Sequence, residues 1–276
     1  MAISAQDVKK LREMTQAGMM DCKRALEEAD GDFEKAIDIL RKKGQKVSQK
    51  RKDREAKEGL IVAKIADDNK SGILVEVNCE TDFVARNEVF ARFADDVAAL
   101  ILRAQPVDLD ALKALDFKDG RTAGEALTDL TGKIGEKLGI RRFQILRSHQ
   151  GQVISYIHPG ARLGVLIDLQ GNGHLEAAGR DVAMQVAALN PVATHREEVP
   201  QEVQQKELDI GREAARNQGK PEHLIDRIAT GKLERYFKDH VLVEQPFVKD
   251  ASRTVKQMLQ QAEADVRTFV RFALGD

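Results

Sequence analysis

The 276-residue sequence has no tryptophan, two tyrosines and two cysteines, and aromatic residues make up 4% of it. So few aromatic side chains argue against a platform that stacks the bases of a single-stranded nucleic acid. The two cysteines, Cys22 and Cys79, are too few for a disulfide scaffold or a structural zinc site, which favours a reducing compartment. No apolar run approaches the roughly 20 residues that cross a bilayer, and the first residues show no signal-peptide pattern. We therefore expect a soluble, cytoplasmic protein.

The sequence also lacks a large net charge, because its 44 Lys and Arg residues nearly balance its 45 Asp and Glu residues. This balance argues against a protein that coats nucleic acid by neutralising phosphates, although it leaves room for a local basic patch. The sequence also lacks a phosphate-binding G-x-x-x-x-G-K loop, a G-x-S-x-G nucleophile elbow and an H-E-x-x-H zinc motif. Gly171-Asn172-Gly173 opens no dinucleotide fingerprint, and the six histidines show no metal spacing with the cysteines. We expect no cofactor and no bound metal.

Cys79 is the remaining candidate for covalent chemistry. Its neighbours Glu76 and Glu80 would raise the pKa of a thiol, whereas a nucleophilic cysteine needs a lowered pKa. We therefore predict a buried structural cysteine and a protein that is not an enzyme. A small-molecule enzyme that uses Cys79 stays as a rival hypothesis.

Residues 1–46 predict a module of three short helices. Val8, Leu11 and Met14 recur at a spacing of three, which is typical of one helix face. The first two helices are separated by a break at residues 16–18. Three residues are placed to cap helix starts and one to end the third helix: Ser4, Asp21 and Asp32 as N-caps, and Gly44 as the C′ residue. A bundle this small has a small core, and we expect it to bind something.

Residues 47–58 contain many Lys and Arg residues and almost no apolar ones. We interpret them as a solvated basic linker, in part helical. The alternative is a phosphate-binding arm, which would make the protein a nucleic-acid-binding protein.

The rest of the chain repeats one pattern, and its fold class is α+β. Residues 59–150 read as strand, strand, helix, helix, strand, and the same order returns in residues 151–194 and 241–276. We predict a duplicated core of two three-stranded antiparallel sheets with helices. Residues 195–240 interrupt the second repeat and predict an inserted helical hairpin with a turn at Gly219-Lys220-Pro221.

The segment from Thr81 to Asn87 follows the second strand of the first repeat and is about three residues longer than its counterpart in the second repeat. Two interpretations have equal weight. In the first, Thr81 caps a helix and Phe83 and Val84 belong to the core. In the second, Asp82 and Phe83 project from a rigid turn, where an exposed Phe would anchor a partner.

Four motifs closely resemble the bacterial translation elongation factor Ts family. They are Leu11-Arg12-Glu13-Met14-Thr15-Gln16-Ala17-Gly18-Met19-Met20-Asp21-Cys22-Lys23-Arg24-Ala25-Leu26, Glu76-Val77-Asn78-Cys79-Glu80-Thr81-Asp82-Phe83-Val84-Ala85-Arg86-Asn87, His158-Pro159-Gly160-Ala161-Arg162-Leu163-Gly164-Val165-Leu166 and Glu244-Gln245-Pro246-Phe247-Val248-Lys249-Asp250. The resemblance covers the whole chain in order. It implies a ubiquitin-associated-like amino-terminal module, a duplicated core and an inserted hairpin.

The same resemblance implies guanine-nucleotide exchange on elongation factor Tu, in its GDP-bound or nucleotide-free state, without covalent chemistry. The residues that it assigns to displacement of Mg²⁺ in the partner are Thr81, Asp82, Phe83 and Val84. Met19 and Met20 match partner-binding positions, although one of them is expected in the core, and His158 matches an interface position away from the nucleotide. Phe247 is expected in the core.

The lack of a long apolar run and the balanced charge predict no contact with a membrane or with nucleic acid. The resemblance leaves open a homodimer through the inserted hairpin. Longer members of the family continue past the last strand into another helical module, whereas this chain stops at Asp276. We expect that contact with the partner to be missing.

Overall fold

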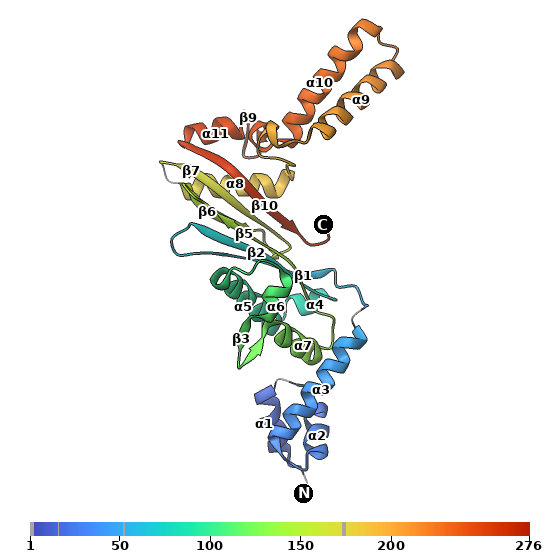
Figure 1. Ribbon diagram of the computed structural model, residues 1–276, viewed down its shortest axis with the longest axis vertical. Coiled ribbons are helices and arrows are strands. Elements are labelled where there is room, and N and C mark those ends of the chain that lie inside the picture. The colour runs from blue at the N-terminus through green and yellow to red at the C-terminus, as the bar shows by residue number, and fades with distance from the viewer. Residues whose placement is uncertain (1–2, 16, 52, 173–174) are drawn as a thin grey trace. The chain divides into compact units, whose positions relative to one another are not determined.

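The computed structural model describes residues 3–15, 17–51, 53–172 and 175–276 (Figure 1). Four residues discussed above lie outside the described residues: Gln16 of the expected break, Lys52 of the basic segment, and Gly173 and His174. The chain divides into two compact units: residues 1–62, 75–143 and 274–276 form the first, and residues 63–74 and 144–273 form the second. Within the described ranges, no helix is long and apolar enough to cross a membrane. The expected mixture of helices and antiparallel strands is confirmed.

Three helices open the first unit: α1 (Ala5–Thr15), α2 (Met19–Glu28) and α3 (Phe33–Arg51). The predicted caps at Ser4 and Asp32 are confirmed. Ser4 Oγ accepts a hydrogen bond from the backbone N–H of Asp7 at 3.1 Å, and Asp32 Oδ1 accepts one from Lys35 at 3.1 Å. The three helices enclose a small core made of Val8, Leu11, Ala17, Cys22, Ala25, Leu26, Ala29 and Ala36.

The predicted cap at Asp21 is wrong, because α2 begins two residues earlier with Gly18 at its N-cap. Asp21 lies in the first turn, where the helix dipole favours a negative charge. Its carboxylate forms an ion pair with Lys43 Nζ of α3 at 2.5 Å, which ties the start of α2 to α3.

The predicted helix end at Gly44 is also wrong, because α3 continues to Arg51. Gly44 lies instead against Gly132 of α7 (Ala123–Ile134): a Cβ added at Gly132 would lie 2.3 Å from the Cα of Gly44. Two residues without side chains allow the two helix backbones to come this close. The first residues of the expected basic linker are therefore helical, and α3 packs directly against α7.

Replacing Gly132 by Ala is expected to destabilise the protein by about 1–3 kcal/mol, because the new Cβ meets backbone that cannot rotate away. Chemical unfolding measures this change. Gly231→Ala in α10 (Glu222–His240) is the matched control, because a Cβ there meets nothing within 4 Å. That control should gain about 0.5–1 kcal/mol from helix propensity. A Gly132→Ala protein as stable as the Gly231→Ala protein would contradict the close contact.

The first three-stranded sheet has the order β1-β2-β5. Its strands are β1 (Glu58–Ile65), β2 (Ser71–Cys79) and β5 (Gly139–Arg147), in the order predicted for this repeat. The central strand carries a fully buried carboxylate, Glu76. Glu76 accepts hydrogen bonds from Arg142 Nε at 2.7 Å and from Arg141 Nη1 at 3.1 Å, both on β5. This pairing satisfies a charge that would be costly to bury alone.

Between β2 and β5 the chain forms four helices and a small ribbon. The elements are α4 (Asp82–Ala85), α5 (Glu88–Ala104), α6 (Leu109–Ala114), β3 (Asp116–Lys118), β4 (Arg121–Thr122) and α7. The two longest of these helices are α5, which ends at Ala104, and α7, which ends at Ile134. Gly135 ends α7 with a φ of +78°, a left-handed conformation that suits glycine.

The second sheet has the order β10-β7-β6, so its three strands follow the same relative order as those of the first sheet. The strands are β6 (Gln152–Ile157), β7 (Leu163–Gly171) and β10 (Ala264–Ala273), with α8 (Leu175–Leu189) and α11 (Val255–Gln261). Two short helical turns, η1 (Arg196–Glu198) and η2 (Leu242–Glu244), and a ribbon of β8 (Pro246–Phe247) and β9 (Asp250–Thr254) complete this unit. Phe247 is 2% exposed, so its predicted place in the core is confirmed.

The predicted hairpin consists of α9 (Gln201–Asn217) and α10, drawn side by side in orange in Figure 1. Gly211 lies against Ala229, which lets the two helices approach closely. The base of the hairpin is held by Arg196, whose guanidinium donates to Glu234 at 3.0 and 2.8 Å and also to Glu244. The side-chain hydrogen bonds to Glu244 and Glu234 raise the pKa of Arg196, so this cation stays charged.

Candidate functional site

The segment between β2 and α5 forms a single helical turn with a cap at each end. Thr81 Oγ1 accepts a hydrogen bond from the backbone N–H of Val84 at 3.4 Å, and Asn87 Oδ1 caps α5 through Val89 at 2.8 Å. Phe83, in the middle of the turn, is 81% exposed. The interpretation that placed Phe83 in the core is therefore wrong, and Val84 is only half-buried. An exposed Phe on a capped turn presents a large apolar contact surface at a fixed position.

Glu136, which follows α7, fixes the start of this turn through Thr81. The Glu136 carboxylate accepts hydrogen bonds from the Thr81 backbone N–H at 3.0 Å and from Thr81 Oγ1 at 2.8 Å. The Cys79 thiol donates to the Thr81 carbonyl at 3.1 Å. Three contacts on one residue therefore hold the position from which Asp82 and Phe83 project.

Glu80, the residue before Thr81, joins the turn to the end of α3. Its carboxylate accepts hydrogen bonds from Arg51 Nη1 at 3.2 Å, from Arg54 Nη1 at 3.0 Å and from the Lys137 backbone N–H at 2.6 Å. Burial alone would raise the pKa of Glu80, but these donors hold it below its usual value. The carboxylate is therefore charged at neutral pH, and it links the amino-terminal helices to the turn.

Among the residues that the structure describes, one weak ion pair restrains the Asp82 side chain. Its carboxylate forms an ion pair with Arg86 Nη2 at 3.0 Å, one helical turn away, and the Asp82 side chain is 48% exposed. Exposed pairs at this spacing contribute only about 0.3–0.5 kcal/mol. Asp82 can therefore exchange Arg86 for another partner at little cost.

The prediction of a buried Cys79 is confirmed, because none of its surface is exposed. Burial raises the pKa of the Cys79 thiol to about 12, and the negative charges of Glu136 and Glu58 add to this effect. The pKa of Cys79 is raised, as predicted, but the carboxylates that raise it are Glu136 and Glu58 and not Glu76 and Glu80. Those two are paired with arginines. The thiol is protonated at neutral pH, so it is a poor nucleophile.

The methionines of the amino-terminal module differ from the prediction. Met19 is 50% and Met20 is 58% exposed, so neither belongs to the core. Both lie in the first turn of α2, whose inner face is occupied by Cys22 and Leu26. Met14, which the spacing assigned to a helix face with Val8 and Leu11, is 57% exposed. Met14 is the last apolar residue before the predicted break, and this position is the sequence feature that could have indicated its exposure. The module thus exposes three flexible apolar side chains, a residue type that adapts to different contact partners.

His158 lies in the second unit, in the turn between β6 and β7, and is exposed. Its backbone N–H donates to Leu163 at 2.9 Å, and its carbonyl accepts from Ala161 at 2.9 Å, so the turn is closed at both ends. The His158 Nδ1 and Tyr156 Oη atoms are 2.9 Å apart, within hydrogen-bond distance. The imidazole is therefore oriented by Tyr156 while its other side faces solvent.

Comparisons with known proteins identify the family of this chain. The family model described as Elongation factor TS matches residues 80–276. A curated relative from Chloroherpeton thalassium, named Elongation factor Ts, is 44% identical over 285 residues, which cover 99% of this chain and 99% of its own. Relatives of the same name from Chlorobium limicola and Amoebophilus asiaticus are each 45% identical and cover 99% and 100% of both chains, respectively. The chain therefore belongs to the elongation factor Ts family.

Proposed function

We propose that this protein is a guanine-nucleotide exchange factor that promotes release of GDP from elongation factor Tu. The observation that carries the proposal is Phe83, 81% exposed on a turn that Glu136 braces through Thr81. In this proposal, Asp82 and Phe83 enter the partner beside its magnesium and nucleotide site, supported by Thr81 and Val84. An apolar side chain that is exposed to water in the free protein contributes favourable binding free energy when a partner buries it.

The exchange needs no covalent step. Mg²⁺ bridges the phosphates of a nucleotide and protein oxygens, so a group that disturbs the metal weakens the binding of GDP. Linkage requires that GDP weakens the binding of the factor by the same ratio. The factor therefore passes through a nucleotide-free complex, and incoming nucleotide releases it. A protonated Cys79 thiol and the lack of a catalytic motif are compatible with this role.

Other parts of the chain extend the proposed interface. Met19 and Met20 would contact the nucleotide-binding domain of the partner, and His158 would contact it away from the nucleotide. We further propose that residues 1–46 form a ubiquitin-associated-like module, that the two sheets are copies of one unit, and that the protein acts in the cytoplasm.

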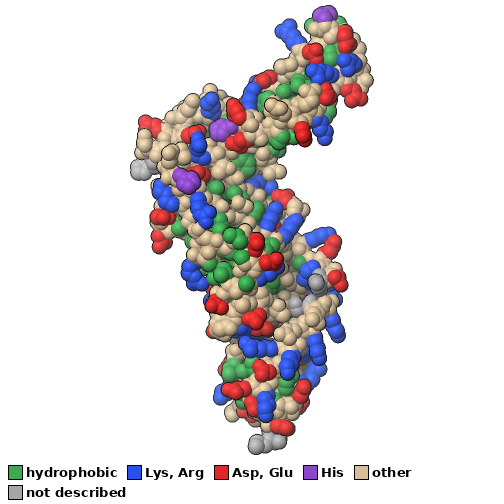
Figure 2. All heavy atoms as spheres, viewed as in Figure 1, with side chains coloured by type: hydrophobic (Ala, Val, Ile, Leu, Met, Phe, Trp, Pro, Cys, Tyr) green, Lys and Arg blue, Asp and Glu red, His purple; other side chains and the backbone are tan. Residues whose placement is uncertain are grey.

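The alternative, a nucleic-acid-binding protein that uses residues 47–58, is less favoured. Binding of phosphates needs cations that are free to face them. Arg51 and Arg54 both pair with Glu80, at 3.2 and 3.0 Å, and Lys57 pairs with Glu55 at 2.6 Å. Figure 2 shows basic and acidic side chains interspersed over the visible face. Retention on RNA that falls steeply with salt would favour this alternative.

The proposal is tested by the release of labelled GDP from elongation factor Tu with and without this protein. We expect release to accelerate strongly, with no hydrolysis of nucleotide by the factor alone. An unchanged release rate at saturating factor would refute the proposed function.

Replacing Asp82 by Ala is expected to slow GDP release by roughly five- to tenfold in Mg²⁺. The loss should be smaller after Mg²⁺ is removed with a chelator, because the carboxylate acts through the metal site. Stopped-flow release assays under both conditions measure the two losses.

The matched control for this variant is Glu88→Ala, which removes an 85% exposed carboxylate just beyond the turn. We expect it to have no effect in either condition. Equal losses for Asp82→Ala with and without Mg²⁺ would show that Asp82 only shapes the turn.

A further inference from the structure

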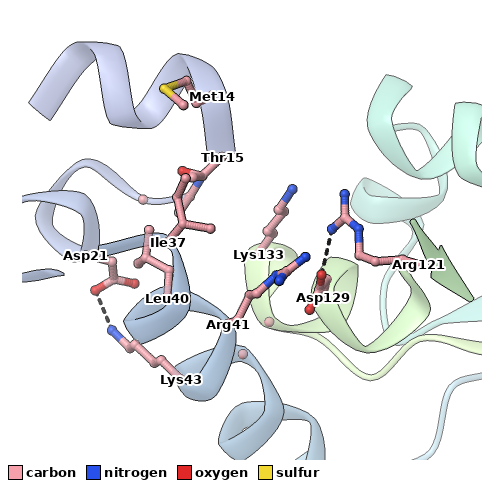
Figure 3. A pocket seen from close by; sticks show the side chains of 14 residues that line it. Met14, Thr15, Asp21, Ile37, Leu40, Arg41, Lys43, Arg121, Asp129 and Lys133 are labelled. Carbon is pink, nitrogen blue, oxygen red and sulfur yellow. Dashed lines mark hydrogen bonds and ion pairs between the residues drawn. The ribbon is translucent and has the colours of Figure 1, made fainter. Parts of the chain in front are cut away.

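A cleft of about 170 Å³ lies within the first unit, where α3 faces α7 (Figure 3). Met14, Ile37 and Leu40 form an apolar wall on the side of the amino-terminal helices. Gly44 and Gly132, the close contact of the two helices, also line it. The cleft therefore lies where the module meets the rest of its unit, and both helices contribute side chains to it.

Positive charge in this cleft exceeds negative charge. Four cations line it, Arg41, Lys43, Arg121 and Lys133, against two carboxylates, Asp21 and Asp129. Lys43 pairs with Asp21 at 2.5 Å, and Arg121 pairs with Asp129 at 2.7 Å. In the described part of the chain, neither Arg41 nor Lys133 has a carboxylate within ion-pair distance.

The two cations without a carboxylate come from opposite sides. Figure 3 shows Arg41 extending from α3 toward α7, and Lys133 extending from α7 into the same cleft beside Arg121. Desolvation and the positive charge of Arg121 lower the pKa of Lys133, and the carboxylates of Asp129 and Asp119 offset this only in part. Lys133 and Arg121 repel each other, and the carboxylate of Asp129 is already bound to Arg121, so an anion beside Lys133 would remove a repulsion that these carboxylates leave in place.

We propose that this cleft binds an anion of the phosphate class between Arg41 and Lys133. Its volume fits a small occupant, because pockets for whole drug-sized ligands measure about 300–1,000 Å³ and one water takes about 30 Å³. Free phosphate and the phosphate group of an ester share this chemistry. Because Arg41 belongs to α3 and Lys133 to α7, the anion would also bridge the two helices next to Gly44 and Gly132.

Calorimetric titration of the full chain in a phosphate-free buffer tests the site. Inorganic phosphate and adenosine monophosphate serve as separate probes. We expect saturable binding with one site per chain, and about tenfold or more weaker binding for Arg41→Gln and for Lys133→Gln, since each removes a charge-assisted hydrogen bond. Whichever probe binds more tightly identifies the source of the phosphate group, and either preference supports the site.

Lys46→Gln is the matched control, because Lys46 is exposed on α3 but does not line the cleft. It should bind phosphate like the unmodified protein. Both Arg41 and Lys133 are exposed, so their variants are expected to keep the thermal midpoint of the unmodified chain. Absence of saturable binding, or an equal loss in Lys46→Gln, would overturn the proposal. No partner protein is needed, so this result is independent of the proposed exchange function.

Discussion

With Phe83 replaced by Ala, GDP release from elongation factor Tu is expected to slow by about thirtyfold or more at sub-saturating factor, the loss that follows from removing an interface anchor worth at least about 2 kcal/mol. The thermal midpoint should hardly change, because an 81% exposed ring contributes little to the folded state. The loss should persist when Mg²⁺ is chelated, since an apolar contact favours the distorted partner whether or not metal is present. Release assays and thermal unfolding of the same preparation measure both effects.

Val107→Ala controls for the loss of an exposed apolar side chain in the same unit, because Val107 is 90% exposed. Both its exchange rate and its midpoint should equal those of the unmodified chain. If Phe83→Ala lowered the midpoint by many degrees, Phe83 would be a structural residue, and the proposed insertion would lose its main support.

Phe90→Ala is expected to have the opposite profile. Phe90 lies on α5 with none of its surface exposed, so truncation leaves a cavity and should cost about 3–5 kcal/mol. For a chain of this length the midpoint should fall by roughly 6–20 °C. At temperatures below the midpoint of the Phe90→Ala protein, the exchange activity should be largely retained, because Phe90 does not reach the surface.

Thermal unfolding followed by circular dichroism measures the cost, with Phe83→Ala as the matched truncation. A Phe90→Ala protein that unfolds at the original temperature would show that the interior near α5 is loosely packed.

The pair Phe83 and Phe90 shows why the sequence left the role of the turn undecided. Their spacing of seven residues would place both on one face of a continuous helix. Asn87 caps a new helix between them, so the two side chains belong to separate helices and have different exposure. Thr81 and Asn87 are both residues that can cap a helix, and the structure shows Asn87 at the start of the long helix while Thr81 is held by Glu136 from a distant part of the chain.

Gly44 illustrates a second limit. A glycine after an apolar periodic segment is typical of a helix end, and it is equally typical of a close contact between helices. The deciding partner, Gly132, lies far along the chain, and no local pattern points to it. The same holds for Cys79, whose pKa is raised by Glu136 and Glu58 rather than by its sequence neighbours.

The sheets were predictable because short apolar runs bounded by turns mark strands, and both predicted three-stranded sheets are present, with the central strands β2 and β7 buried over most of their length. The elements that the sequence did not indicate are all two to six residues long: α6, the ribbon of β3 and β4, the ribbon of β8 and β9, and the turns η1 and η2. Elements of that length show no periodicity, and their conformation depends on the helices next to them.

The contacts of Arg196 with Glu234 and Glu244 at the base of the hairpin affect how the second sheet assembles. Ala264 of β10 pairs with Gly171 of β7, so the sheet closes across a connection of about ninety residues. Closure entropy grows slowly, by about 0.6 kcal/mol for each doubling of loop length. Because Arg196 joins Glu234 and Glu244, the antiparallel pair α9 and α10 returns the chain to its starting point, and the effective loop is much shorter. The outer part of the hairpin can therefore lengthen, shorten or diverge at almost no entropic cost to the sheet that carries it.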